Sequence, residues 1–180
     1  MDTNSLLIKN GSLVNSSGVV KSDIFISGGK ITQIGTSLDC EADRVIDAAD
    51  KYIFPGLIDP QVHFRDPGLT HKEDLKTGSM AAAAGGITTF FEMPNTNPST
   101  ITLEKLEKKY KVASEKCITN FSFFFGATND NIEEIKKMDN TCGLKIFMGS
   151  STGDLLVDDD EALDRIFSCC DKIIAVHAED

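Results

Sequence analysis

The sequence predicts an α/β protein with a parallel sheet, preceded by a small β-rich unit. Short β-type runs separated by turn residues fill residues 1–55, and from residue 56 onward apolar runs alternate with helical patterns, as in βαβ units. The expected strand ends lie about 30 residues apart, the repeat length of a (β/α)8 barrel. They fall at Arg65, Pro94, Gly126, Gly149 and Ala178.

The first domain, residues 1–55, is predicted to be part of a β-structure. The runs LLIKNGSLVN, VVKSDIFISGGKITQIG and RVIDAADKYIFPG carry the β-branched and aromatic residues typical of strands. Asn10-Gly11 and Gly28-Gly29 have the composition of hairpin turns. Pro55-Gly56 marks the expected boundary to the second domain.

The second domain, residues 56–180, is predicted to contain five strands. The strand runs are GLIDPQVHFR, GITTFFEMP, ITNFSFFFG, GLKIFMG and KIIAVHAED, and the helical segments between them are HKEDLKTGSMAAAAG, TLEKLEKKYKVASE, NIEEIKKMD and DDEALDRIFSCC. No helix follows the fifth strand, which favours the first part of a truncated barrel. An open, doubly wound sheet is the structural alternative.

Composition excludes several classes of function. The formal net charge of -10 argues against a nucleic-acid or anionic-membrane surface, which needs clustered Lys and Arg. The sequence has no basic leader and no run near the ~20 apolar residues of a membrane helix, so a cytoplasmic location is expected. Its 5 cysteines lack C-x-x-C spacing and are expected to be reduced.

Polar residues at the carboxyl ends of parallel strands are the best candidates for chemistry. Gln61, His63 and Arg65 alternate along the first strand of the second domain and share a face. His63 and His177 are candidate metal ligands or hydrogen-bonded interior histidines. Lys145 lies inside a strand, where a bare ammonium is costly unless it is paired, neutralised or modified; otherwise its amine reaches solvent from a frayed strand end.

Arg65 and Asn95 are candidates for an anion clamp. Arg65 offers a planar fork of donors suited to a carboxylate, and Asn95, in MPNTNP, can add an amide donor. Two structural alternatives stay open: an ion pair of Arg65 with a nearby Asp, and ordinary turn chemistry for Asn95.

The loop GSSTG, residues 149–153, matches the G-x-S-x-G pattern of serine hydrolases, with Ser151 as candidate nucleophile and Asp158 and His177 downstream. The serine of this motif turns directly into a helix, whereas DLLVDDDE follows here. The segment between Ser151 and His177 is also too short to hold the strands that normally separate such residues. We therefore favour other roles for this loop.

At FPGLIDPQVHFRDPG, EMPNTNP, GLKIFMGSSTG and VHAED the sequence resembles dihydroorotases, members of the cyclic amidohydrolase group of the amidohydrolase superfamily. This resemblance covers residues 53–180 and implies a metal-dependent (β/α)8 TIM barrel, represented here by about five βα units. The first 55 residues resemble the amino-terminal part of a small β-sandwich, whose other part is expected after the barrel.

The resemblance also implies roles for individual residues. His63 would bind zinc, Lys145 would be carboxylated by carbon dioxide and bridge two zinc ions, and His177 would bind the second ion. Arg65 and Asn95 would hold the carboxylate of dihydroorotate or N-carbamoyl-L-aspartate. A metal-bound hydroxide would attack the ring amide, so that the enzyme interconverts these two compounds in pyrimidine biosynthesis.

Two departures from the family pattern limit this expectation. The usual strand motif is His-x-His, and here its first position is Gln61, whose amide is a weaker zinc donor; one or two zinc ions are therefore expected. The family's catalytic aspartate and its remaining histidine ligand would lie beyond Asp180, so no catalytic residue is assigned within the chain. The open sheet edges of the five-strand portion are expected to promote association in isolation.

Two other functions are weighed against dihydroorotase activity. Hydantoinases and allantoinases share the barrel and the metal, but their cyclic ureides carry no ring carboxylate for Arg65 to bind. A non-catalytic, dihydroorotase-like scaffold that binds aspartate transcarbamoylase would explain Gln61 and the missing ligands. The expected partners are the small-molecule substrate, the remaining barrel sequence and further copies of the chain.

Overall fold

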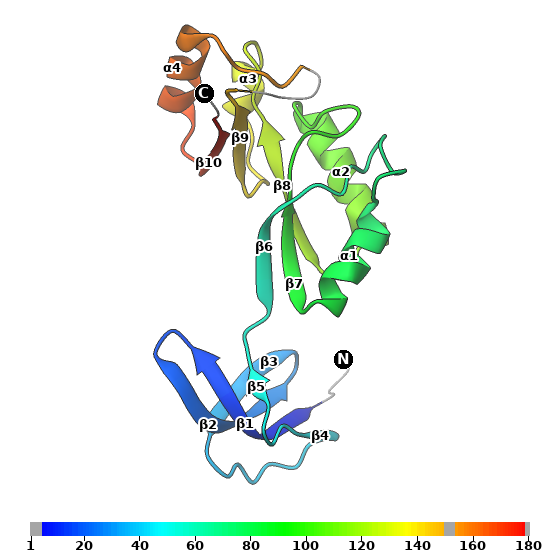
Figure 1. The fold of residues 1–180 in the computed structure, drawn as a ribbon, viewed down its shortest axis with the longest axis vertical. Helices are drawn as coiled ribbons and strands as arrows, with labels where there is room; N and C mark the ends of the chain where they lie inside the picture. The colour runs from blue at the N-terminus through cyan, green and yellow to red at the C-terminus, as the bar shows by residue number, and fades with distance from the viewer. Residues whose placement is uncertain (1–4, 150–153, 179–180) are drawn as a thin grey trace. The chain divides into compact units, whose positions relative to one another are not determined.

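The computed structural model describes residues 5–149 and 154–178 of the chain, and its contacts divide the chain into two compact units, Met1–Pro55 and Gly56–Asp180 (Figure 1).

The first unit is a five-stranded sheet with the order β3-β2-β1-β4, in which β5 also pairs with β1. β1, β2 and β3 are antiparallel neighbours, whereas β4 and β5 run parallel to β1. Leu7 and Ile24 are buried in its core. The strands are β1 (Leu6–Asn15), β2 (Gly18–Ser27), β3 (Lys30–Gly35), β4 (Arg44–Asp47) and β5 (Tyr52–Ile53).

One of the two predicted hairpin turns is correct and the other is wrong. Gly28 and Gly29, with φ of 58° and 73°, connect β2 to β3 as predicted. Asn10 and Gly11 instead form a bulge inside β1, where the pairing register with β2 shifts. A side chain on Gly11 would come within 2.2 Å of Ile53, so glycine is needed here for close packing and not for a turn.

The second unit is a five-stranded sheet with the order β10-β9-β8-β7-β6, and all neighbouring strands are parallel. This confirms the predicted α/β class. The strand order follows the chain without the reversal that defines a doubly wound sheet. The strands are β6 (Leu57–Val62), β7 (Ile87–Glu92), β8 (Asn120–Gly126), β9 (Gly143–Phe147) and β10 (Ile174–His177).

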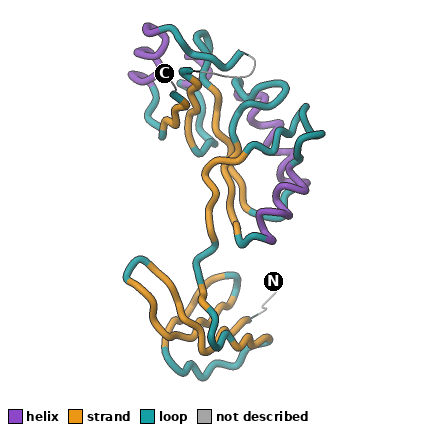
Figure 2. Tube along the Cα trace, in the orientation of Figure 1, coloured by secondary structure: helices purple, strands orange, loops and turns teal. Residues whose placement is uncertain are grey.

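Helices follow the strands in the alternation that the sequence predicts (Figure 2). Three of them begin at a residue whose side chain accepts a hydrogen bond from a backbone N–H of the first turn, namely Asp74, Thr102 and Asp159. Such caps satisfy amide groups that the helix itself cannot. The helices are α1 (Leu75–Ala84), α2 (Leu103–Lys116), α3 (Ile132–Ile135) and α4 (Asp160–Cys169).

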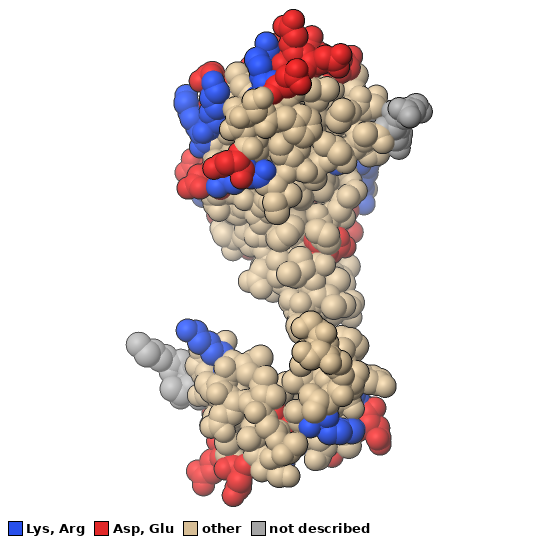
Figure 3. Space-filling model, turned by 90° about the vertical axis from the view of Figure 1, so that its left-hand side faces the viewer, with Lys and Arg blue, Asp and Glu red and all other residues tan. Residues whose placement is uncertain are grey.

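Aromatic and aliphatic side chains fill the core between this sheet and its helices. Phe90, Phe123, Phe125, Leu144 and Ile146 are fully buried, and each buried side chain of this size contributes roughly 1.5–3 kcal/mol of transfer free energy. The outermost strands, in contrast, carry exposed apolar side chains, such as Ile58 on β6 and Val176 on β10. Figure 3 shows a face of this unit whose middle carries few charged side chains. No helix within the described ranges is both long and apolar enough to cross a membrane.

Gly68 lies where the loop after β6 crosses the loop after β7. Its φ is 90°, and a Cβ there would lie 1.9 Å from the carbonyl oxygen of Asn97. Gly86, after α1, has a similar φ of 85°, but a Cβ added to it would have no neighbouring atom within 4 Å. Gly86 therefore needs glycine only for its backbone conformation, whereas Gly68 needs it both for its conformation and for the space that a Cβ would occupy.

We predict that Gly68→Ala destabilises the full-length protein more than Gly86→Ala. Both variants have the conformational cost of a left-handed alanine, about 1–2 kcal/mol, and Gly68→Ala adds a backbone clash worth a further ~1–3 kcal/mol. Urea unfolding followed by far-ultraviolet circular dichroism measures both. Equal unfolding midpoints for the two variants would contradict the close packing of these loops.

Candidate active site

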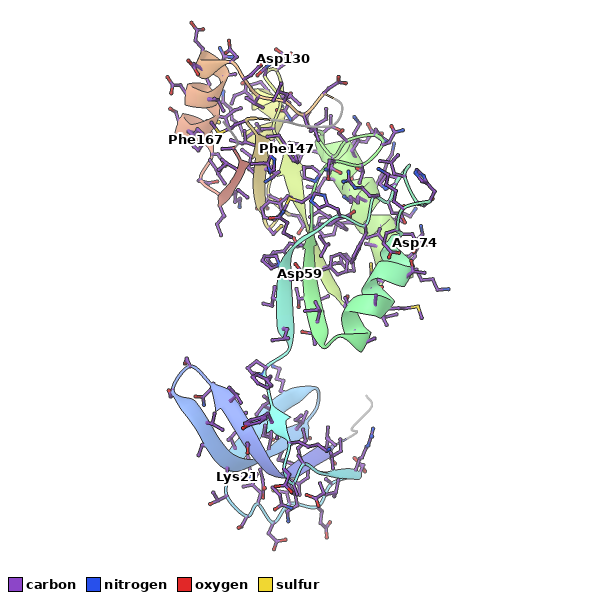
Figure 4. All side chains as sticks on the ribbon, in the orientation of Figure 1. Lys21, Asp59, Asp74, Asp130, Phe147 and Phe167 are labelled. Atoms are coloured by element: carbon purple, nitrogen blue, oxygen red, sulfur yellow. The ribbon has the colours of Figure 1, made fainter. Side chains whose placement is uncertain are left out.

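The predicted site residues lie on four strands of the second unit or in the loops that follow them. His63 and Arg65 follow β6, Asn95 follows β7, Lys145 is inside β9, and His177 ends β10. Because the strands are parallel, their carboxyl ends share one edge of the sheet. Figure 4 labels Phe147, the last residue of β9, at this edge.

His63 is oriented by Asn95. Its Nδ1 lies 2.9 Å from Oδ1 of Asn95, and because a carbonyl oxygen can only accept, the ring donates through Nδ1 and leaves Nε2 unprotonated. Burial, and to a smaller extent the nearby charges of Arg65 and Lys145, lower the pKa of His63. The ring is thus held in the neutral form that a metal ligand requires.

Asn95 also holds the side chain of Arg65. Nη1 of Arg65 donates to the backbone oxygen of Asn95 over 3.1 Å, while the side-chain oxygen is engaged by His63. Among the described residues, the Nδ2 group of this largely buried side chain has no hydrogen-bond acceptor, so it can donate to a ligand. Asn95 therefore contacts both the candidate metal ligand, His63, and the candidate anion-binding residue, Arg65. The sequence alone predicts it only as a donor in the anion clamp.

Arg65 has an unfavourable backbone conformation. Its φ is 65°, a left-handed geometry that costs a non-glycine residue roughly 1–2 kcal/mol. β6 consequently ends at Val62, three positions before the strand end that the sequence predicts. No ion pair between Arg65 and a carboxylate occurs in the parts of the chain that the structure describes. The neighbouring Asp66 instead pairs with Lys116 at 2.7 Å.

Lys145 is buried in the middle of the sheet, with 4% of its surface exposed. It lies opposite Gly126 of β8 and Ala175 of β10, so it is not at a frayed strand end. Its Nζ lies 5.0 Å from the ring centroid of Phe147, and within the described residues it pairs with no carboxylate. Burial lowers the pKa of Lys145, because an ammonium is poorly solvated there.

Phe147 lies between the two candidate ligands of β9 and β10, and the sequence motifs did not point to it. Its ring centroid is 6.0 Å from that of His177 and 5.0 Å from the amine of Lys145. His177 is opposite Phe147 in the strand register. The alternation Lys-Ile-Phe in β9 was the available signal, because residues two apart in a strand share a face.

Gln61 and Ser151 are two further positions singled out from the sequence. Gln61 is exposed, and its backbone N–H donates to Oδ1 of Asp59 over 3.0 Å. Ser151, the candidate nucleophile of the serine-hydrolase alternative, lies outside the described residues.

The donor chemistry of these residues fits a metal ion under one condition. No group of three or more His, Cys, Asp and Glu residues suited to a metal occurs in the described portions of the chain. His63 and His177 supply imidazole nitrogens, and Lys145 becomes an anionic oxygen ligand only when it is carboxylated. Its lowered pKa favours the neutral amine that reacts with carbon dioxide.

A buried ion pair beside the site was not predicted from the sequence. Nζ of Lys109, on α2, lies 2.9 Å from Oε2 of Glu92, the last residue of β7, and both side chains are at most 1% exposed. The signal was present in α2, where Leu106, Lys109 and Ala113 follow the spacing of a core-facing stripe. Burial raises the pKa of Glu92 and lowers that of Lys109.

Comparisons with known proteins agree on one family. A family model described as "Dihydro-orotase-like" matches residues 50–146. The chain is 35% identical to an allantoinase of Bacillus velezensis over 181 residues, covering 97% of this chain and 40% of that protein. It is 41% identical to a dihydroorotase of Methanosarcina mazei over 180 residues, covering 96% of this chain and 39% of that protein.

A solved structure shows the same fold. The L-hydantoinase (dihydropyrimidinase) from Arthrobacter aurescens superposes with a TM-score of 0.92 at 35% sequence identity, covering 99% of this chain and 41% of that one. The chain spans about two fifths of the length of these relatives. Their names include three different activities.

We predict that Lys145→Met stabilises the metal-free, full-length protein in buffer without carbon dioxide. The folded-state pKa of Lys145 is depressed below its ordinary value of 10.5, so burying the charged amine costs stability at neutral pH, on the order of 1 kcal/mol. This advantage of the variant should shrink as the pH rises toward 10.5, where the lysine is increasingly neutral in both states. Urea unfolding at pH 7 and pH 10 measures the difference in stability between the variant and wild type. A variant less stable than wild type at pH 7 would show that burial of the Lys145 amine does not cost stability.

Proposed function

Because the chain belongs to the dihydro-orotase-like family, whose model matches residues 50–146, we propose that the full-length protein is a zinc-dependent dihydroorotase. It would interconvert N-carbamoyl-L-aspartate and dihydroorotate in pyrimidine biosynthesis. The parallel sheet of the second unit would be the first part of a (β/α)8 barrel, whose later strands cover the exposed apolar side chains of β6 and β10. The first unit would be part of a β-sandwich.

The observation that carries this proposal is the environment of the Arg65 guanidinium. Its guanidinium is anchored to a backbone carbonyl at 3.1 Å and, in the described residues, has no carboxylate partner. Dihydroorotate carries a ring carboxylate that would fill this position, with the Nδ2 group of Asn95 as a second donor. Cyclic ureides without that carboxylate would leave the cation unpaired.

The metal would be held by His63, His177 and a carboxylated Lys145. When bound, zinc supplies Lewis acidity and activates water for hydrolysis. His63 would present its Nε2, because its Nδ1–H group donates a hydrogen bond to Oδ1 of Asn95. The lone pair of the neutral Lys145 amine would attack the carbon of carbon dioxide and form the N–C bond. One carbon–oxygen π pair would move to oxygen, and the nitrogen would release one proton to water, which leaves a carbamate anion. The residue that moves the proton of the substrate amide would come from later in the sequence.

A second candidate function has support from the comparisons. Relatives named allantoinase and L-hydantoinase align with nearly the whole chain, so a related cyclic ureide is the alternative substrate. The scaffold alternative has its support in Gln61, which replaces the first histidine of the usual metal motif.

Zinc removal and restoration test the proposal. The full-length protein, freed of metal with a chelator, is assayed with dihydroorotate, hydantoin and allantoin before and after zinc is added. We expect zinc to restore hydrolysis of dihydroorotate well above that of the two ureides. Restoration with a ureide alone would assign the alternative substrate class, and a protein that neither retains zinc nor acts on any of the three would be the scaffold.

We predict that Arg65→Met in the full-length enzyme raises the KM for dihydroorotate about 10- to 100-fold, the range for losing charge-assisted hydrogen bonds of ~1.5–3 kcal/mol. The kcat should fall much less, because the reacting amide is elsewhere on the ring. Arg165→Met is the matched control, since Arg165 is an exposed residue of α4. An unchanged KM in Arg65→Met would remove the clamp role.

A further inference from the structure

We propose that Glu92 and Lys109 form a positioning pair, which fixes the backbone of Arg65 and thereby aims its guanidinium at the substrate carboxylate. The proposal rests on the proposed function, because it takes this carboxylate as the ligand of Arg65. Both side chains are at most 1% exposed, so the pair would act through Arg65 and not by contact with the substrate.

The two oxygens of the Glu92 carboxylate have different partners. Oε1 accepts the backbone N–H of Arg65 at 2.9 Å, and Oε2 meets Nζ of Lys109 at 2.9 Å. The amine of Lys109 also lies 3.4 Å from the backbone oxygen of Met93. A carboxylate held on both sides in this way cannot rotate without losing one of its contacts.

The hydrogen bond from the Arg65 N–H to Glu92 is made at a residue with an unfavourable backbone conformation. Arg65 has a left-handed φ of 65°, which is unfavourable for a residue with a side chain. Glu92 lies 27 positions later in the chain, so this hydrogen bond ties the loop after β6 to the end of β7. Beyond it, Nη1 of Arg65 reaches the backbone oxygen of Asn95. Contacts are therefore continuous from α2 to the guanidinium.

Stability alone does not account for a charged pair at this place. Replacing a buried ion pair by apolar residues of similar size is often neutral or stabilising, because desolvation offsets the attraction. An apolar pair would, however, leave the N–H of Arg65 without an acceptor. The distinguishing property of Glu92 is therefore its Oε1, with Lys109 as the partner that holds the other carboxylate oxygen in place.

Two double variants of the full-length enzyme separate these contributions. E92Q/K109M removes both charges but keeps a side-chain oxygen for the N–H of Arg65. E92L/K109M removes both charges and the oxygen. K108M is the matched control on α2, because the side chain of Lys108 is 71% exposed.

Two readouts are needed. Hydrogen exchange of the peptide that carries residues 63–67 reports on the Arg65 amide independently of any substrate. Steady-state kinetics with dihydroorotate report on the aim of the guanidinium. We expect E92L/K109M to exchange this amide at least about tenfold faster and to raise the KM about tenfold with a smaller change in kcat. K108M should stay near wild type in both. E92Q/K109M keeps the acceptor but loses the Lys109 contact that fixes it, so it should lie between wild type and E92L/K109M.

Each other outcome is decisive. If E92L/K109M folds, acts on dihydroorotate and matches wild type in either the exchange rate or the KM, the proposal is wrong. If the exchange pattern appears as expected but the wild-type enzyme does not act on dihydroorotate, the positioning of Arg65 stands and the proposed function fails. Should E92L/K109M not fold, K109M alone decides: it keeps the acceptor but frees the carboxylate, so faster Arg65 exchange supports the proposal and unchanged exchange overturns it.

Discussion

The parallel pairing of β6 through β10 is the constraint on which the candidate site depends. Residues as far apart in the chain as His63 and His177 reach one edge of the sheet because every strand ends there. The register places Lys145 between Gly126 and Ala175, deep enough to be desolvated. The strand order and register thus determine which of these side chains lie close together, and the chemistry of the candidate site follows from that placement.

The second element of the site is the set of loop contacts that follows β6 and β7. Asn95 contacts the ring of His63 and the guanidinium of Arg65 at once. A displacement of this loop would therefore disturb the proposed metal ligand and the proposed anion-binding residue together. The left-handed Arg65 and the desolvated Lys145 both cost stability, as is common where groups are held ready for ligands. The aromatic core around Phe90 and Phe123 offsets such costs.

Much of this arrangement could be predicted from the sequence, since strand alternation and spacing report directly on a parallel sheet. The patterns in residues 56–180 predicted the right order of strands and helices, and the polar residues at the predicted strand ends lie at one edge. The hairpin turn predicted at Asn10-Gly11 was wrong, because this dipeptide suits both a turn and a β-bulge. The buried stripe of α2 indicates that Lys109 faces the core, but no local pattern identifies Glu92 as its partner. The end of β6 was misplaced because Arg65 turns back toward Glu92.

A crystal structure of the full-length protein with zinc and dihydroorotate tests the central claim most directly. We expect zinc on His63, His177 and a carboxylated Lys145, with the ring carboxylate of the ligand against the guanidinium of Arg65 and the Nδ2 group of Asn95. An unmodified Lys145 without zinc nearby, or a ligand whose carboxylate lies away from Arg65, would contradict it.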